Sequence, residues 1–171
     1  ELINEFFEIT RFNLSEQRLE IGTVNVTRML EQISWEFHAL LAERGLSFKL
    51  ELEPDLVIRC DVNKMERVFD NLIRNAVHYS YENSEIFVRA ARTADGGVEI
   101  RFENRGKTIP ADKLERLFEQ FFRLDASRGT ATGGAGLGLA IAREIVNLHG
   151  GSIEAFSADE TIAFTIRLPA G

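Results

Sequence analysis

The stretch Gly133-Gly134-Ala135-Gly136-Leu137-Gly138-Leu139 decides how this sequence is interpreted, together with Asn71-Leu72-Ile73-Arg74-Asn75 earlier in the chain. Glycines that open a helix bring bare backbone N–H groups and the positive end of the helix dipole against an anion. Two asparagines four residues apart place neutral oxygen atoms on one helical face. Together the two stretches predict a nucleoside triphosphate that is held through a hard metal ion.

The composition indicates one folded domain that does not bind nucleic acid. The 171 residues are 44% hydrophobic, which is enough to bury a substantial core. The net charge is −7, and Lys and Arg are scattered singly instead of forming the basic face of a phosphate-backbone binder. The one cysteine, Cys60, ends an apolar run and is expected to be a packed hydrophobe and not a reactive thiol. No apolar run approaches the roughly 20 residues that span a bilayer.

The first residues form an apolar helical stripe as soon as the chain opens: Leu2, Ile3, Phe6, Phe7 and Ile9. We therefore expect a helix that continues from a preceding segment of a longer protein. Residues 1–17 are assigned to this helical end and residues 18–171 to the main domain.

Periodicity along the chain predicts an α+β fold, a two-layer sandwich and not a doubly wound parallel sheet. Asp95-Gly96-Gly97 separates two alternating runs and predicts a hairpin, and the last two strands predict a second one. Asn63 and Glu66 match a capping box at the start of a helix. Sheet partners are expected to be adjacent in sequence. The expected strands are 19–24, 46–52, 57–60, 86–90, 98–102, 152–156 and 161–168, and the expected helices are 26–41, 63–80, 111–121 and 135–149.

A polar band runs along one edge of the helix that contains both asparagines. Its members are Asn71, Asn75, His78 and Tyr79, at positions i, i+4, i+7 and i+8. Mg²⁺ takes oxygen ligands and is commonly held by few protein groups together with phosphates and water. Asn75 is therefore predicted to ligate Mg²⁺. The glycine cluster matches neither a Walker P-loop nor a dinucleotide fingerprint, so close helix packing stays open as its explanation.

Four segments in order resemble the N, G1, F and G2 boxes of sensor histidine kinases. They are Asn71-Leu72-Ile73-Arg74-Asn75-Ala76-Val77-His78-Tyr79-Ser80, Asn104-Arg105-Gly106-Lys107-Thr108-Ile109-Pro110, Leu117-Phe118-Glu119-Gln120-Phe121-Phe122-Arg123 and Gly134-Ala135-Gly136-Leu137-Gly138-Leu139. Within the family the chain is most similar to the vancomycin-resistance sensor kinases. The resemblance implies a Bergerat-type fold, with a mainly antiparallel sheet covered by about three helices, that binds ATP and Mg²⁺.

The resemblance also assigns roles to single residues. Asn75 would bind Mg²⁺, Asn71 would lie beside the phosphates, His78 would reach them and Tyr79 would pack against the base. Asn104 stands where the family usually has an aspartate that binds the adenine amino group, and Gly106 lets the backbone approach. Phe118 and Phe122 would pack under a lid. The remaining implied ATP contacts are Ile109, Arg123, Arg128, Gly134, Gly136, Leu137 and Gly138.

The implied activity is transfer of the ATP γ-phosphoryl group to a histidine on a separate helical domain. None of His38, His78 and His149 lies in a phosphoacceptor motif, so the acceptor would lie outside this chain. The implied partners are the chain's own dimerisation and phosphotransfer domain and a response regulator, in a cytoplasmic domain of a membrane-anchored homodimer. Two alternatives stay open: a hydrolytic ATPase related to gyrase or Hsp90, which would need a glutamate where Asn71 stands, and a non-catalytic nucleotide-binding module.

Overall fold

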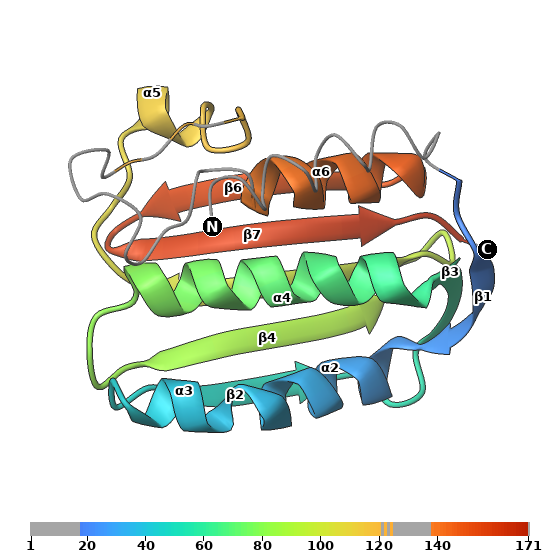
Figure 1. Ribbon diagram of the computed structural model, residues 1–171, viewed down its shortest axis with the longest axis horizontal. Helices are drawn as coiled ribbons and strands as arrows, with labels where there is room; N and C mark the ends of the chain where they lie inside the picture. The colour runs from blue at the N-terminus through green and yellow to red at the C-terminus, as the bar shows by residue number, and fades with distance from the viewer. Residues whose placement is uncertain (1–17, 121, 123, 125–137, 171) are drawn as a thin grey trace.

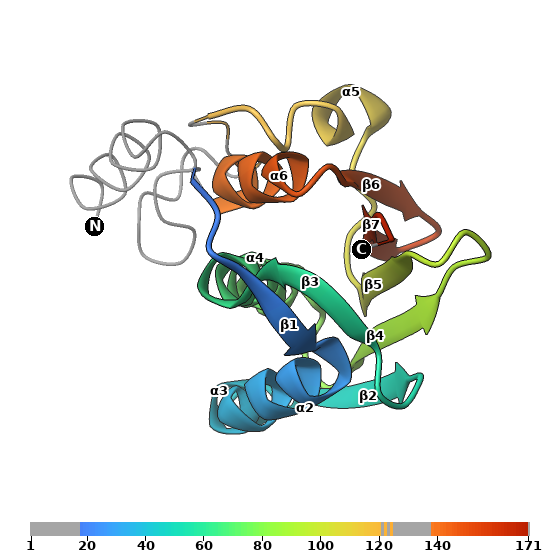
Figure 2. The ribbon, with the colours of Figure 1, turned by 90° about the vertical axis from the view of Figure 1, so that its right-hand side faces the viewer.

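Helices cover one face of a five-stranded sheet, and no helix of the described residues covers the other face (Figures 1 and 2). The computed structural model describes residues 18–120, 122, 124 and 138–170. The strands are β1 Ile21–Asn25, β2 Ser47–Leu52, β3 Val57–Asp61, β4 Glu85–Arg92, β5 Val98–Arg105, β6 Ser152–Ala158 and β7 Thr161–Leu168. The helices are α2 Val26–Glu36, α3 His38–Ala42, α4 Val62–Tyr79, α5 Ala111–Leu114 and α6 Gly138–Leu148.

The large sheet has the strand order β2-β4-β5-β7-β6 and is antiparallel except for the parallel pair β2 and β4. The two expected hairpins are confirmed as the pairs β4 with β5 and β6 with β7. The expectation that all sheet partners are adjacent in sequence is wrong. β1 and β3 form a separate two-stranded sheet, and β2 joins β4 across the intervening β3 and α4.

The core lies between the sheet and α4, which runs across the middle of the sheet in Figure 1. All seven apolar residues expected on the buried stripe of α4 are buried: Met65, Val68, Phe69, Leu72, Ile73, Ala76 and Val77. β5 supplies the facing column, with Val98, Ile100 and Phe102 turned inward and buried. Full burial of side chains of this size contributes about 1.5–3 kcal/mol each. This packing fixes which edge of α4 stays accessible.

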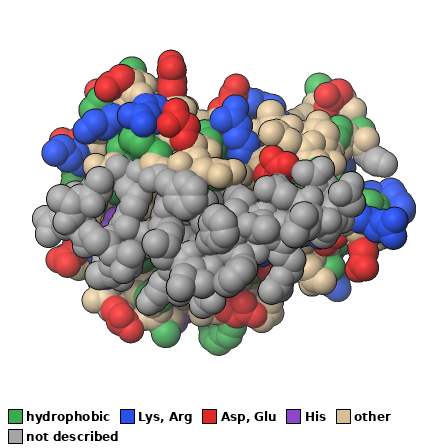
Figure 3. Space-filling model, turned by 45° about the horizontal axis from the view of Figure 1, so that its top comes forward, with side chains coloured by type: hydrophobic (Ala, Val, Ile, Leu, Met, Phe, Trp, Pro, Cys, Tyr) green, Lys and Arg blue, Asp and Glu red, His purple; other side chains and the backbone are tan. Residues whose placement is uncertain are grey.

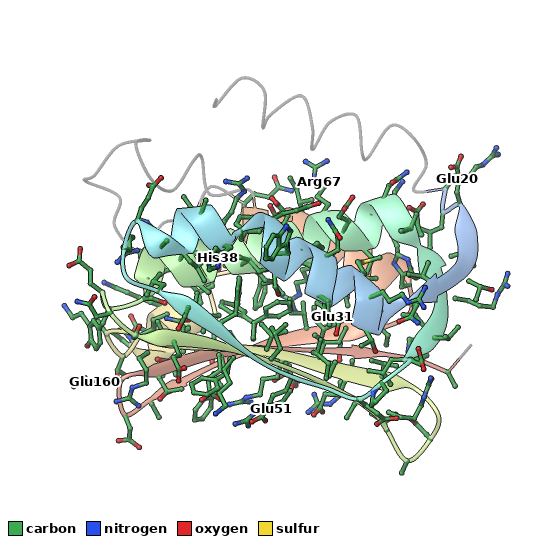
Figure 4. The ribbon with its side chains drawn as sticks, turned by 90° about the horizontal axis from the view of Figure 1, so that it is seen from below. Glu20, Glu31, His38, Glu51, Arg67 and Glu160 are labelled. Carbon is green, nitrogen blue, oxygen red and sulfur yellow. The ribbon has the colours of Figure 1, made fainter. Side chains whose placement is uncertain are left out.

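The outer face of the sheet is polar, and Figure 4 shows Glu51 on the side away from the helices. Glu51 pairs with Arg89 across the strands at 2.9 Å. Arg167 pairs with Glu99 and Glu154, each at 2.9 Å. Exposed pairs of this kind contribute little stability, so the face behaves as a solvated surface. Figure 3 shows Lys/Arg and Asp/Glu side chains interspersed over the described part of the upper surface.

The start of α4 differs from the sequence prediction. Its N-cap is Asp61 and not Asn63, because the Asp61 carboxylate accepts a hydrogen bond from Lys64 N at 3.0 Å. The same carboxylate accepts from Glu20 N at 2.8 Å. Burial opposes ionisation of Asp61, but these two hydrogen bonds, with Lys64 and His149 nearby, lower its pKa overall. The carboxylate is thus held charged at the helix start, where the dipole favours it.

The expected helix 111–121 is also shorter, because α5 ends at Leu114. Hydrogen bonds at three-residue spacing replace the helical pattern beyond it, as in Leu117 N to Leu114 O and Glu119 N to Arg116 O. The expected helix 26–41 is divided at Phe37 into α2 and α3. Helix 135–149 begins at Gly138 in the described part and ends before Gly150, whose φ is +77°.

The end of α6 is fixed to the start of α4 by His149. Its Nδ1 lies 2.8 Å from Ile145 O, and its Nε2 accepts from Asp61 N at 3.0 Å. Cys60, next to Asp61, is buried, and burial with the Asp61 charge raises its pKa to about 11. The expectation that Cys60 is a packed side chain is therefore confirmed, and a raised pKa disfavours the reactive thiolate. Within the described residues no helix is both long and apolar enough to span a bilayer.

Candidate functional site

The C-terminal end of α4 and the end of β5 lie at the left of Figure 1. The first turn of α6 lies near them, above the middle of α4. Asn71, Asn75, His78 and Tyr79 are all partly accessible along one edge of α4, beside its buried stripe. The predicted polar band therefore exists, and it borders the junction of these three elements.

Asn71 connects α4 to the beginning of α6. Its Nδ2 donates to Gly138 O at 3.0 Å. This bond holds the first residue of an 11-residue helix beside the polar band. The unpaired N–H groups and positive dipole end of such a helix favour an anion. Asn71 and Gly138, which are 67 residues apart along the chain, are thus brought together.

Asn104 is the polar member of the inward column of β5. It follows Val98, Ile100 and Phe102 on the helix-facing side and is only 2% exposed. Among the described residues, its Nδ2 has no hydrogen-bond partner. A buried donor left unpaired costs on the order of 1–3 kcal/mol. A buried amide N–H without a partner fits a site where a bound ligand supplies the missing acceptor.

Gly106 is tightly packed beside Asn104. A Cβ added to Gly106 would lie 2.2 Å from Tyr79 O and 3.2 Å from both Asn104 Nδ2 and Ile162 Cδ1. The glycine is therefore required by space, since backbone and side chain from two other elements surround it. Thr108, which stands where a second glycine is common in the resembling family, accepts from Glu160 N through Oγ1 at 2.7 Å. The hydroxyl thus anchors the turn between β6 and β7.

Phe118 of the third box contacts both β7 and α6. Phe118 meets Phe164 edge to face, with ring centres 6.0 Å apart, and the Arg143 guanidinium lies 5.1 Å from the Phe118 ring centre. The Arg116 guanidinium lies 4.6 Å from the ring centre of Phe122. Ile109 is buried, and its N–H donates to Ser157 Oγ at 2.9 Å. Arg123, Arg128, Gly134, Gly136 and Leu137 lie outside the described residues.

One structural contributor was missed from sequence. The Arg44 guanidinium, from the turn after α3, donates to Val77 O and to Ser80 O, the latter at 2.6 Å. Val77 lies in the last turn of α4, whose carbonyls lack partners within the helix, and Ser80 is its C-cap. Arg44 therefore fixes the helix end that carries His78 and Tyr79. No local pattern signals this contact, because it joins positions 33 residues apart.

The comparisons with known proteins agree with this arrangement. Residues 60–171 match the family described as "Histidine kinase-, DNA gyrase B-, and HSP90-like ATPase". The chain is 51% identical over 168 residues to the sensor protein VanSC of Enterococcus gallinarum, covering 98% of this chain and 46% of that protein. It is 45% identical over 170 residues to the sensor protein VanS of Enterococcus faecium, covering 99% and 44%. The chain thus spans less than half the length of these relatives.

Solved structures show the same fold. The catalytic domain of histidine kinase ThkA, in a nucleotide-free form, superposes with a TM-score of 0.79 at 26% sequence identity, covering 88% of this chain and 96% of that domain. The mycobacterial sensor histidine kinase MprB gives a TM-score of 0.73 at 27% identity, covering 86% and 96%. The chain therefore belongs to the histidine kinase-, DNA gyrase B- and HSP90-like ATPase family of ATP-binding domains, with the fold of a histidine kinase catalytic domain.

Proposed function

We propose that this chain binds Mg-ATP at the junction of α4, β5 and α6 and donates the γ-phosphoryl group to a histidine on a separate helical domain. The similarity to VanSC and VanS over nearly the whole chain supports a place in a VanS-like sensor kinase. The parent protein would then be a membrane-anchored homodimer that responds to glycopeptides. Its partners would be its own dimerisation and phosphotransfer domain and a response regulator.

The base would bind beside Asn104 and Gly106. The buried amide with its unpartnered Nδ2 fits a base that offers an acceptor, and the missing Cβ of Gly106 lets the backbone approach closely. Tyr79 would lie against the base, and His78 would reach the phosphates. The triphosphate would extend toward Asn71 and the first turn of α6, where Gly138 begins the helix. Arg123, Arg128, Gly134 and Gly136 are proposed as further phosphate contacts.

Asn75 would hold Mg²⁺ through its side-chain oxygen. It lies one turn beyond Asn71 on the same accessible edge of α4. Mg²⁺ commonly keeps few protein ligands and takes the rest from phosphates and water, so one amide suffices. The ion would offset phosphate charge as the γ-phosphoryl group leaves.

The amide at position 71 is the observation that favours transfer over hydrolysis. Asn71 uses its NH₂ group to hold Gly138 O, and an amide cannot act as a general base near neutral pH. No Asp or Glu occupies positions 67, 71, 75, 78 or 79 on this edge of α4. Positioning and electrostatics then remain as the catalytic contributions, as in phosphoryl transfer generally.

Calorimetry and phosphate release on the same sample test this function. We expect Mg²⁺-dependent ATP binding, with phosphate release no faster than from ATP alone. Fast Mg²⁺-dependent phosphate release would place the chain among the hydrolytic ATPases of the family instead. Absence of ATP binding at every Mg²⁺ concentration would refute the site altogether.

A further inference from the structure

The Nδ2 of Asn104 is buried without a hydrogen-bond partner among the described residues. It sits in the apolar column of β5, where a bare donor is unfavourable. Ser34 Oγ on α2 is the other buried side-chain atom without a partner among the described residues.

An amide can present its donor and its acceptor in either order. The NH₂ group donates and the carbonyl oxygen accepts, and a half-turn about the terminal torsion exchanges the two. Gly106 lies next to this amide, and a Cβ there would crowd Nδ2 at 3.2 Å. Ile162 Cδ1, on the same side, offers no hydrogen bond that would favour one orientation.

Purine bases come with both orders of these groups. A 6-aminopurine presents an amino donor beside an N1 acceptor, whereas a 6-oxopurine presents an O6 acceptor beside an N1–H donor. We infer that Asn104 lets this site accept 6-oxopurine nucleoside triphosphates as well as 6-aminopurine ones, an inference that rests on the proposed function. In each case the carbonyl oxygen accepts from the base and Nδ2 donates to it.

A carboxylate at this position would behave differently. It has no N–H donor, so it accepts from a 6-amino group or an N1–H but repels O6. Asn104→Asp therefore tests the donor directly, because it changes the amide NH₂ to an oxygen at nearly constant volume. Asn104→Leu removes donor and acceptor together while keeping similar bulk. Asn147→Asp, on the exposed face of α6, is the matched control for added charge.

The experiment measures the Kd of Mg-ATP and Mg-ITP, which share ribose and triphosphate, by calorimetry at a temperature where every variant is folded. We expect wild type and Asn147→Asp to bind the two within about threefold of each other. In Asn104→Asp, ITP should bind roughly tenfold or more weakly than ATP, since one hydrogen bond is lost and an acceptor faces an acceptor. Asn104→Leu should weaken both by a similar factor.

Three results would overturn the inference. They are a wild-type preference for ATP over ITP of tenfold or more, an unchanged ATP-to-ITP ratio in Asn104→Asp, and unchanged affinities in Asn104→Leu. Failure of the proposed function looks different: neither nucleotide would bind in a Mg²⁺-dependent way, and the inference would fall with it. When wild type binds both nucleotides and Asn75→Ala weakens the binding of both, the ratio of the ATP and ITP Kd values alone decides the inference.

Discussion

Gly106→Ala should disrupt the nucleotide site through a backbone clash. The added Cβ would lie 2.2 Å from Tyr79 O, well inside the roughly 3.3 Å of a close C–H···O contact, so about 1 Å of movement is needed. Neither side yields easily. Gly106 N donates to Glu160 O at 3.1 Å, and Tyr81 N donates to Arg105 O at 2.9 Å. The displacement therefore falls on the junction that brings Asn104 to the end of α4.

Overpacking of this kind typically costs about 1–3 kcal/mol, which corresponds to a Tm decrease of roughly 2–12 °C for a chain of this size. Gly97→Ala is the matched control, because its Cβ would lie 2.3 Å from Leu168 O at the opposite end of β5. It should lose similar stability but keep ATP affinity. Gly22→Ala, whose Cβ meets nothing within 4 Å, should lose neither.

Thermal unfolding and ATP calorimetry, the latter well below every Tm, separate these effects. We expect Gly106→Ala to lose both stability and affinity. If Gly106→Ala bound ATP as tightly as wild type, the base site beside Asn104 and Gly106 would be refuted. Equal losses of affinity in Gly97→Ala and Gly106→Ala would show that affinity follows global stability and not local geometry.

Three further changes have defined outcomes. Asn75→Ala should lower the Mg²⁺-dependent part of ATP affinity roughly tenfold or more, as calorimetry with and without Mg²⁺ would show. Its Tm should stay nearly constant in thermal unfolding. An unchanged Mg²⁺ dependence of ATP binding would show that Asn75 is not a Mg²⁺ ligand. Arg44→Met should cost about 1–2 kcal/mol of stability in urea unfolding, because it leaves carbonyls of α4 unpaired, whereas exposed Arg28→Met should not. The pKa of Asp61 is lowered in the folded chain, so the stabilisation from its carboxylate is complete above about pH 4 and is lost as the pH falls through the folded-state pKa. Asp61→Asn should therefore flatten the profile of unfolding free energy against pH in that acid range. An unaltered profile would assign the acid loss of stability to other groups.

Local chemistry determined the parts of the fold that sequence could predict. Asp95-Gly96-Gly97 and the turn before Thr161 connect antiparallel neighbours directly, so both hairpins follow from a few residues. β3 and α4 separate β2 from β4 in sequence, so their parallel pairing depends on contacts that no short window contains. The cap of α4 was misplaced because Asn63 and Glu66 match a motif, while Asp61 caps through contacts with Glu20 and Lys64.

The site follows the same division. The asparagine edge of α4 was predictable from helical spacing, because all its members lie on one helix. The meeting of Asn71 with Gly138 followed from the family resemblance and not from periodicity. Burial of Asn104 without a partner and the contact of Arg44 with the end of α4 needed the tertiary structure, since both depend on residues from distant strands and turns.

Phosphoryl transfer to a separate domain is the central claim, and one measurement tests it most directly. The chain is incubated with γ-labelled ATP and Mg²⁺, with and without a helical domain that carries the acceptor histidine of a VanS-type sensor kinase. We expect acid-labile label on the acceptor domain and no label on this chain. The Asn75→Ala variant should transfer no label to the acceptor domain. Release of the label as inorganic phosphate at the same rate with and without the acceptor, which itself stays unlabelled, would contradict it.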